Sequence, residues 1–133
     1  MAEKAVITIL LAAADVTAIA GQRVRPAAQA QFDAFPFVTL RITDYEQIAT
    51  HSGPSGFAKT TVTIDAWALN YKDAMNLQNK IRLALQYKSG DFGGVAVKGI
   101  MPQGKSEFQE QSADGTASPV YAVSADYVVI HAE

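Results

Sequence analysis

The chain has 133 residues, of which 49% are hydrophobic, 18% charged and 9% aromatic, and its 11 basic and 13 acidic side chains give a formal net charge of −2. This size is typical of one ordinary folded domain, and the weak negative charge argues against a nucleic-acid module with one dominant basic face. The absence of cysteine excludes disulfides, thiolate nucleophiles and cysteine-ligated metal clusters.

The first predicted elements are two short helices. Over residues 4–14 the apolar side chains recur at the i, i+3, i+4 spacing of one helical face. Asp15 is expected to cap a second helical turn over 16–20, which Gly21 ends. The apolar run at 5–11 would also suit a signal peptide, but it is too short to span a membrane. We expect a soluble, unprocessed chain, with a small exported ligand-binding domain as the alternative.

Two strands of a hairpin are predicted next, after a short strand at 23–26 and a polar surface loop over 27–34. Residues 37–46 alternate, with Val38, Leu40 and Ile42 on one face, and residues 59–69 alternate in the same way. Residues 47–56 between them contain the turn-forming string His51-Ser52-Gly53-Pro54-Ser55-Gly56, which predicts a protruding hairpin loop.

A longer helix follows, capped by Asn70, with an apolar stripe that includes Leu77 and Ile81. The glycine-rich segment 89–94 breaks it. Residues 95–101 are predicted as a strand, 103–119 as a polar loop and 120–131 as a closing strand. The whole order predicts one α+β domain over 1–133, with a mainly antiparallel sheet of about four to five strands, two main helices on one face and a long β-hairpin loop.

One string matches a phosphate-binding P-loop, because residues 99–106 read Gly-Ile-Met-Pro-Gln-Gly-Lys-Ser. Such a loop must be followed by a helix whose N-terminal amides face the phosphates. Residues 106–113 carry only Phe108 as a large apolar side chain, so no such helix is expected. A P-loop-like nucleotide-binding protein is therefore kept only as an alternative function.

The remaining reactive side chains form no predicted enzyme, cofactor or metal site. His51 and His131 lack neighbours at metal-ligand spacing, and Gly53-Pro54-Ser55-Gly56 does not meet the serine-elbow pattern. Asp65 and Asp126 lie in predicted strands and could approach each other as paired carboxylates, although a solvated face explains them more simply. Arg23, Arg25 and Arg41 make at most a modest surface patch.

Trp67 stands out because it lies on the strand face opposite the apolar one. Two explanations remain open, namely wrapping by the first helix or burial at a subunit contact.

Several segments in order resemble the tail-completion proteins of long-tailed bacteriophages and prophages, also called tail terminators or head-to-tail joining proteins. The similar segments are Ile9-Leu10-Leu11-Ala12, residues 16–26, Phe35-Pro36-Phe37-Val38, residues 53–58 leading into Val62-Thr63-Ile64-Asp65-Ala66-Trp67-Ala68, residues 81–85, residues 94–100 and residues 121–127. The resemblance covers nearly the whole chain.

The resemblance implies a structural virion protein, assembled in the bacterial host cytoplasm and placed at the head-proximal end of the tail. It implies a hexameric ring that caps the tail tube, with the tube protein and a head completion or connector protein as partners, DNA passing through the ring without sequence-specific binding, no membrane, no cofactor and no catalysis. We expect the partner contacts among His51, Ser52, Pro54, Phe57, Trp67, Arg23, Arg25, Lys105 and Phe108.

Overall fold

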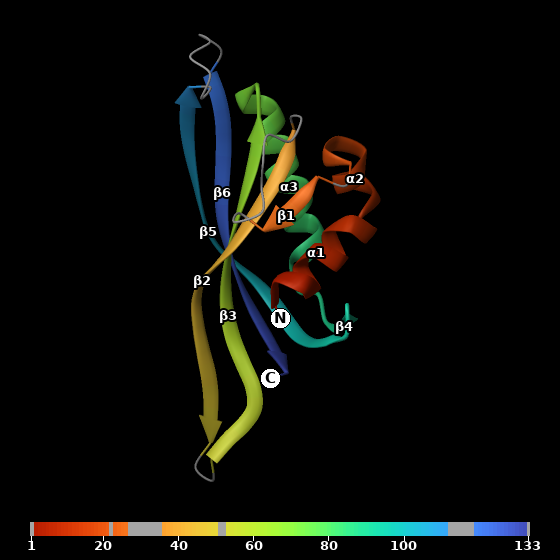
Figure 1. Cartoon of the computed structure of the whole chain (residues 1–133), viewed down its shortest axis with the longest axis vertical. Helices are drawn as coiled ribbons and strands as arrows, with labels where there is room; N and C mark the ends of the chain where they lie inside the picture. Colours follow the sequence, from red (N-terminus) through yellow and green to blue (C-terminus); the bar gives the residue numbers. More distant parts are fainter. Residues whose placement is uncertain (1, 22, 27–35, 51–52, 112–118, 133) are drawn as a thin grey trace.

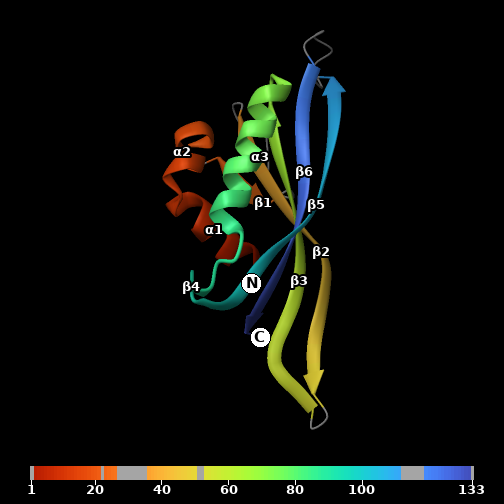
Figure 2. The ribbon, with the colours of Figure 1, turned by 180° about the vertical axis from the view of Figure 1, so that it is seen from behind.

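The computed structural model describes residues 2–21, 23–26, 36–50, 53–111 and 119–132. The elements in chain order are helices α1 (Ala2–Ala12) and α2 (Ala14–Ala20), strands β1 (Val24–Pro26), β2 (Phe37–Thr50) and β3 (Gly53–Ala68), helix α3 (Tyr71–Leu85), and strands β4 (Gly90–Phe92), β5 (Val95–Gln111) and β6 (Pro119–Ala132). All three helices lie on one side of the sheet (Figures 1 and 2). The α+β class and the one-sided helix layer are confirmed.

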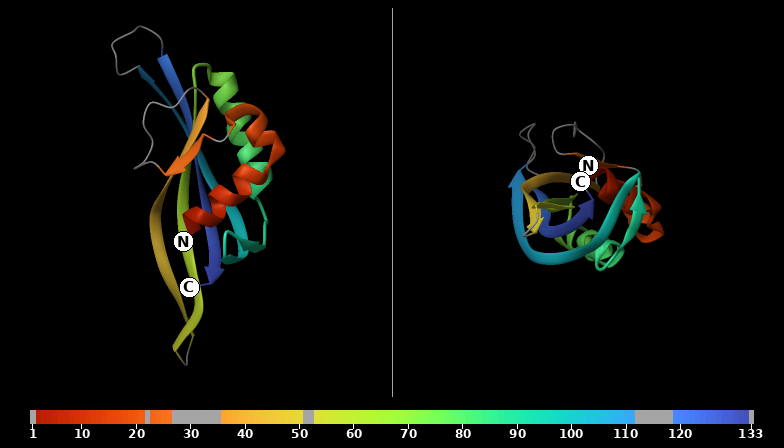
Figure 3. Two further views of the ribbon diagram at one scale, coloured as in Figure 1. Left: turned by 45° about the vertical axis from the view of Figure 1, so that its right-hand side comes forward. Right: turned by 90° about the horizontal axis from the view of Figure 1, so that it is seen from below.

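The described strands form a six-stranded sheet in the order β1-β2-β3-β6-β5-β4. β1 runs parallel to β2, whereas the other neighbouring pairs are antiparallel. The prediction of four to five strands was too low because β4, with only three residues, is too short to show an alternating pattern. The long strands are twisted and curl around the side away from the helices (Figure 3).

Both segments predicted as long loops are mostly strand. β2 runs to Thr50 and β3 begins at Gly53, while β5 runs to Gln111 and β6 begins at Pro119. Residues 51–52 and 112–118, and the predicted loop at 27–34, lie outside the described part of the chain. The two predictions failed because ladder hydrogen bonds use the backbone, so polar and glycine-containing segments can continue a strand that a neighbour already holds.

The core lies between the helices and one face of the sheet. It contains the predicted apolar side chains of the first helix, the hairpin and α3, listed here by element: Val6, Ile9 and Leu10 of α1; Val38 and Leu40 of β2; Val62, Ile64 and Ala66 of β3; Leu77, Ile81 and Leu85 of α3; Tyr127 and Val129 of β6. Ile42 was predicted on this face but is 41% exposed. A β-bulge follows it, between Ile42 and Asp44, where the pairing with β3 shifts.

The helix ends show why two capping predictions held and one did not. The Asn70 side chain accepts a hydrogen bond from the Lys72 amide at 2.9 Å, and Gly21 ends α2 with φ of 61°. Asp15 is not a cap, because α2 begins so soon after α1 that Ala13 occupies the N-cap position and Asp15 lies in the first turn. There its carboxylate can still interact favourably with the positive end of the helix.

One buried polar side chain in the core escaped prediction. Gln78 of α3 donates from Nε2 to the carbonyl oxygens of Ile64 (2.9 Å) and Val123 (2.6 Å), and its Oε1 accepts from the Tyr127 hydroxyl at 3.1 Å. Burial raises the pKa of Tyr127 above its usual range, and the positive charge of Arg82 opposes part of that shift. Gln78 therefore fastens α3 to the two central strands.

Candidate assembly interfaces

The sheet face opposite the helices is built of cross-strand rungs with different chemistry. Following the register from β2 to β3 and β6, one rung holds Phe37, Trp67 and Ala122, the next holds Thr39, Asp65 and Ser124, and the third holds Arg41, Thr63 and Asp126. Because register partners share a face, each rung is a row of side chains on the same surface. This face therefore changes from aromatic to hydroxyl and carboxylate along the strands.

The two carboxylates on this face are held separately. The Ser124 hydroxyl donates to Oδ1 of Asp65, and the Thr63 hydroxyl donates to Oδ1 of Asp126 at 2.6 Å. Asp65 and Asp126 stand on neighbouring rungs rather than opposite each other, and each accepts from a hydroxyl of the adjacent strand. Asp65, Thr63 and Ser124 are buried, so the expectation of a solvated face is wrong for Asp65. The arrangement fits an internal structural network better than the shared-proton pair of an acid–base catalyst.

Trp67 lies at the aromatic end of this face. Its ring stacks on Phe37 with centroids 5.9 Å apart and planes 11° apart, and its Nε1 donates to the Thr39 hydroxyl at 3.0 Å. Wrapping by the first helix is wrong, because α1 packs on the other face (Figure 1). The stack leaves Trp67 partly buried.

The arginines predicted as contacts lie at the same end. Nε of Arg23 donates to the Pro36 carbonyl at 2.9 Å and so ties the start of β1 to the start of β2. Arg25 is exposed and stands in β1 opposite Thr39, one rung from Arg41. The structure thus brings Arg25 and Arg41 to the same margin of the sheet, while Arg23 is used internally.

The remaining predicted contacts are divided between the two hairpins of the sheet. Phe57 of β3 lies near the end of the β2–β3 hairpin, with Nζ of Lys98 5.2 Å from its ring centroid. Pro54 pairs with Ala49 in the same hairpin, whereas His51 and Ser52 lie outside the described residues. Lys105 and Phe108 were predicted in a loop but belong to β5, opposite Ala125 and Ala122 of β6.

His131 of β6 has a structural role. Nδ1 is 2.8 Å from the Ala132 carbonyl oxygen and Nε2 is 2.7 Å from the Thr60 hydroxyl. Since a carbonyl oxygen only accepts, the proton belongs on Nδ1, and Nε2 accepts from Thr60. The buried ring therefore links β6 to β3.

The P-loop string at residues 99–106 is part of β5, which pairs antiparallel with β6. Its backbone is extended, with a bulge between Pro102 and Lys105, instead of a loop that opens a helix. A cavity of about 150 Å³ lies beside this bulge, lined by residues that include Arg82, Gln103 and Asp126. Ligand pockets typically measure about 300–1,000 Å³, so this cavity is too small for a nucleotide.

Among the residues that the structure describes, no group of three or more His, Asp or Glu side chains is placed to hold a metal ion. None of the helices in this part of the chain is long and apolar enough to cross a membrane.

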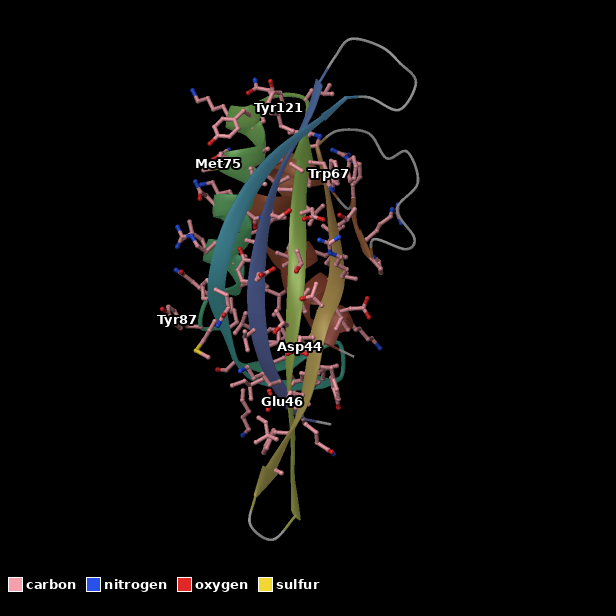
Figure 4. The ribbon with its side chains drawn as sticks, turned by 90° about the vertical axis from the view of Figure 1, so that its left-hand side faces the viewer. Asp44, Glu46, Trp67, Met75, Tyr87 and Tyr121 are labelled. Atoms are coloured by element: carbon pink, nitrogen blue, oxygen red, sulfur yellow. The ribbon has the colours of Figure 1, made fainter. Side chains whose placement is uncertain are left out.

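Large apolar side chains are exposed on both long margins of the sheet, and sequence reasoning missed them. Tyr45 of β2 is 57% exposed, while on the opposite margin Tyr87 is 77% and Met101 of β5 44% exposed. Figure 4 shows Tyr87 beside β5 and Asp44 and Glu46 beside β2. The sequence does contain one pattern from which the β2 margin could have been predicted. It is the string Asp44-Tyr45-Glu46, in which an aromatic residue stands between two acids at the end of an alternating strand.

The comparisons with known proteins agree with this fold. The model of the family described as "Tail completion protein gp17" matches residues 4–123. Among solved structures, a chain from the virion of a native gene transfer agent particle matches with a TM-score of 0.78 and 15% sequence identity, covering 98% of this chain and 94% of that chain. At this identity the match is one of fold. No curated protein gives a significant match to the chain.

Proposed function

The chain belongs to the family of tail completion protein gp17, structural proteins of the bacteriophage virion tail, and on this premise we propose that it forms a hexameric ring that caps the tail tube and joins the tail to the head. The role is architectural and needs no catalysis. Each subunit contributes one segment of the ring, and the tube protein and a head completion or connector protein are its partners.

The observation that carries this proposal is the pair of hairpins that point to opposite ends of the subunit. The β2–β3 hairpin, closed between Thr50 and Gly53, extends to one end, and the β5–β6 hairpin, between Gln111 and Pro119, extends to the other (Figure 1). A protein that joins two different partners along one axis needs a separate contact surface at each end. The predicted contacts Pro54 and Phe57 lie in the first hairpin and Lys105 and Phe108 in the second, while His51 and Ser52 come between β2 and β3 in the sequence.

The lateral margins of the sheet support ring formation. From Arg41 to Gln47, β2 has a paired neighbour on its β3 side only, among the strands that the structure describes, and all seven residues are exposed. An uncovered strand edge is a template for association with another chain. Because the two margins of the sheet differ, a contact between them is head-to-tail, and such contacts close into rings when the rotation fits.

The weak negative charge of the chain suits a passage for DNA. Tight DNA binding depends on lysine and arginine contacts to phosphates, so a ring of subunits that each carry a net charge of −2 would let DNA slide through its lumen.

The test combines mass measurement with capping of purified tail tubes from the virion to which the chain belongs. Light scattering measures the assembly in solution, and negative-stain electron microscopy measures the fraction of tubes with a ring at one end. We expect rings at the tube ends, with six-fold symmetry in averaged images. His51→Glu and Lys105→Glu place a negative charge on each hairpin, so one should impair tube capping and the other head attachment.

Lys72→Glu, on the exposed outer surface of α3, is the matched control and should leave both activities unchanged. Failure of the unmodified chain to bind tubes, together with a monomeric mass at high concentration, would contradict the proposal.

A further inference from the structure

The two lateral margins carry exposed side chains at the same level of the sheet. Following the ladders across β3 and β6, Asp44 of β2 stands on the rung of Met101 of β5, and Tyr45 stands on the rung of Ile100. The Tyr87 amide donates to the Ile100 carbonyl at 2.7 Å. Two exposed tyrosines, Tyr45 and Tyr87, therefore mark opposite ends of one rung.

Tyr87 is held in this position at an energetic cost. Its φ is 59°, which makes it the one described non-glycine residue with positive φ, and β-carbon crowding makes that conformation unfavourable by about 1 kcal/mol or more. The hydrogen bond to Ile100 fixes the strained residue against β5, while 77% of the side chain remains exposed. The positive φ comes directly after Gln86, the C-cap of α3, where a left-handed residue commonly ends a helix, and here it leaves the Tyr87 ring in solvent beside β5.

Near Tyr45, the uncovered edge of β2 is a short regular stretch bounded by β-bulges. Residues 44–47 form a regular stretch between two bulges, one after Ile42 and one after Gln47. Residues 99–102 of β5 form the corresponding stretch between bulges after Val97 and Pro102. The two stretches have the same length and share three rungs, on which Asp44, Tyr45 and Glu46 stand level with Met101, Ile100 and Gly99.

We propose that a second copy of this chain occupies each margin, so that the β2 patch (Ile42, Asp44, Tyr45 and Glu46) of one subunit packs on the β5 patch (Tyr87, Lys88, Lys98 and Met101) of the next. The proposal rests on the ring of the proposed function and names the surfaces that build it. A rotation about an axis along the strands keeps each rung at its level, and so brings Tyr45 and Asp44 to the level of Tyr87 and Met101.

Charge favours the head-to-tail contact over a two-fold one. The β5 patch presents Lys88 and Lys98, both exposed, whereas Asp44 of the β2 patch lies opposite the uncharged Thr61. Lys59 lies opposite Glu46, and its positive charge offsets part of the negative charge that Glu46 adds to the β2 patch. Two β5 patches facing each other would place lysines against lysines, while a β2 patch facing a β5 patch places acids near them, with Glu46 on the rung of Gly99, next to Lys98, and Asp44 two rungs further on. The contact is therefore heterologous, as a closed ring requires.

Cysteine cross-linking tests the contact directly, because the chain has no cysteine of its own. The double variant Tyr45→Cys/Met101→Cys is assembled at high concentration or on tail tubes and treated with a short bismaleimide. We expect a ladder of covalent species that ends at the closed ring on a denaturing gel. Each single variant should give no dimer, because a head-to-tail contact never places identical positions together.

The matched control is Tyr45→Cys/Asn76→Cys, since Asn76 is exposed on the helix side and is absent from both patches. It should stay monomeric on the gel. Rings seen by light scattering without cross-links in the Tyr45→Cys/Met101→Cys variant would overturn this interface and leave the proposed function intact. Dimers from a single variant would overturn the head-to-tail arrangement. A chain that stays monomeric alone and on tubes would overturn both proposals.

Discussion

Gln78 is a polar side chain placed inside an otherwise apolar contact between α3 and the sheet. Its position is tolerated because both ends of the amide have partners, namely two strand carbonyls and the Tyr127 hydroxyl. A fully satisfied buried amide also fixes the rotation of the helix on the sheet, since any other rotation would leave these groups without partners.

Gln78→Leu should therefore be strongly destabilising, although leucine suits the apolar surroundings. It leaves the buried Tyr127 hydroxyl without its acceptor, and we expect a loss of about 2–4 kcal/mol in the free energy of unfolding. Urea denaturation followed by circular dichroism measures the change.

Two further variants separate the hydrogen bond from general packing. Gln78→Leu/Tyr127→Phe removes both partners and should recover part of the loss, while Asn76→Leu on the exposed side of α3 should change stability by less than about 0.5 kcal/mol. A double variant less stable than Gln78→Leu would contradict this account.

Tyr127 also predicts how stability depends on pH. Burial raises the pKa of its hydroxyl in the folded state above the ordinary value of 10.0, so the folded state binds the proton more tightly than the unfolded state. The contribution of Tyr127 to the free energy of unfolding has its full value below a pH of about 10. It falls at higher pH, by at most about 1.4 kcal/mol per pH unit. Urea titrations at a series of alkaline pH values should show the decline.

Tyr127→Phe should remove this component of the decline, whereas Tyr87→Phe, at an exposed tyrosine, should retain it. An identical alkaline decline in the unmodified chain and in Tyr127→Phe would contradict the assignment.

At the scale of elements, the turn between β4 and β5 shows how α1 is placed against the sheet margin. Gly93 and Gly94 both have positive φ, at 59° and 83°. A β-carbon on Gly93 would lie 2.8 Å from the Thr8 hydroxyl and 3.1 Å from Cγ of Lys4, both on α1, whereas one on Gly94 would meet nothing within 4 Å. Only Gly93 therefore permits the close approach of the turn to the helix.

The two glycines form a matched pair of variants. Gly94→Ala should cost about 1 kcal/mol from backbone strain alone, and Gly93→Ala about 2–3 kcal/mol because it adds a clash with α1. Thermal or urea unfolding of both variants measures the difference. An equal loss in the free energy of unfolding for both variants would mean that α1 moves away freely, which would contradict close packing of α1 against the turn.

The secondary structure was predictable where side chains alternate or recur at helical spacing. Val38 and Leu40 identified β2, and Leu77 and Ile81 identified α3, because burial of one face imposes a period on the sequence. The same reasoning missed Gln103 and Gly104, which lie in β5 although their composition predicts a loop. Their strand conformation comes from pairing with β6, which is remote in sequence and leaves no local signal.

At the scale of the whole molecule, the charges of the two margins predict the strength of assembly. If Asp44 and Glu46 of the β2 patch face Lys88 and Lys98 of the next subunit, Asp44→Lys should weaken association several-fold, because a positive charge then enters the patch that faces the lysines. Adding Lys88→Glu and Lys98→Glu in the same chain should restore it. Sedimentation at several protein concentrations measures the association constant.

Lys72→Glu is the control for a general charge effect, since Lys72 belongs to neither patch. If Lys88→Glu and Lys98→Glu lowered the association constant of the Asp44→Lys chain still further, the pairing of the two margins would be contradicted.

By itself the sequence determined the α+β class, the main helix and the paired long strands, and the resemblance of its ordered motifs indicated the tail completion family that the family match confirms. These features are recorded locally, in the period of buried side chains and in short strings. The tertiary structure alone decided the strand order, the separation of Asp65 from Asp126 and the alignment of Tyr45 with Tyr87 on one rung. Such relations depend on which distant segments pair and in what register, and the free energy that selects a register is summed over the whole sheet.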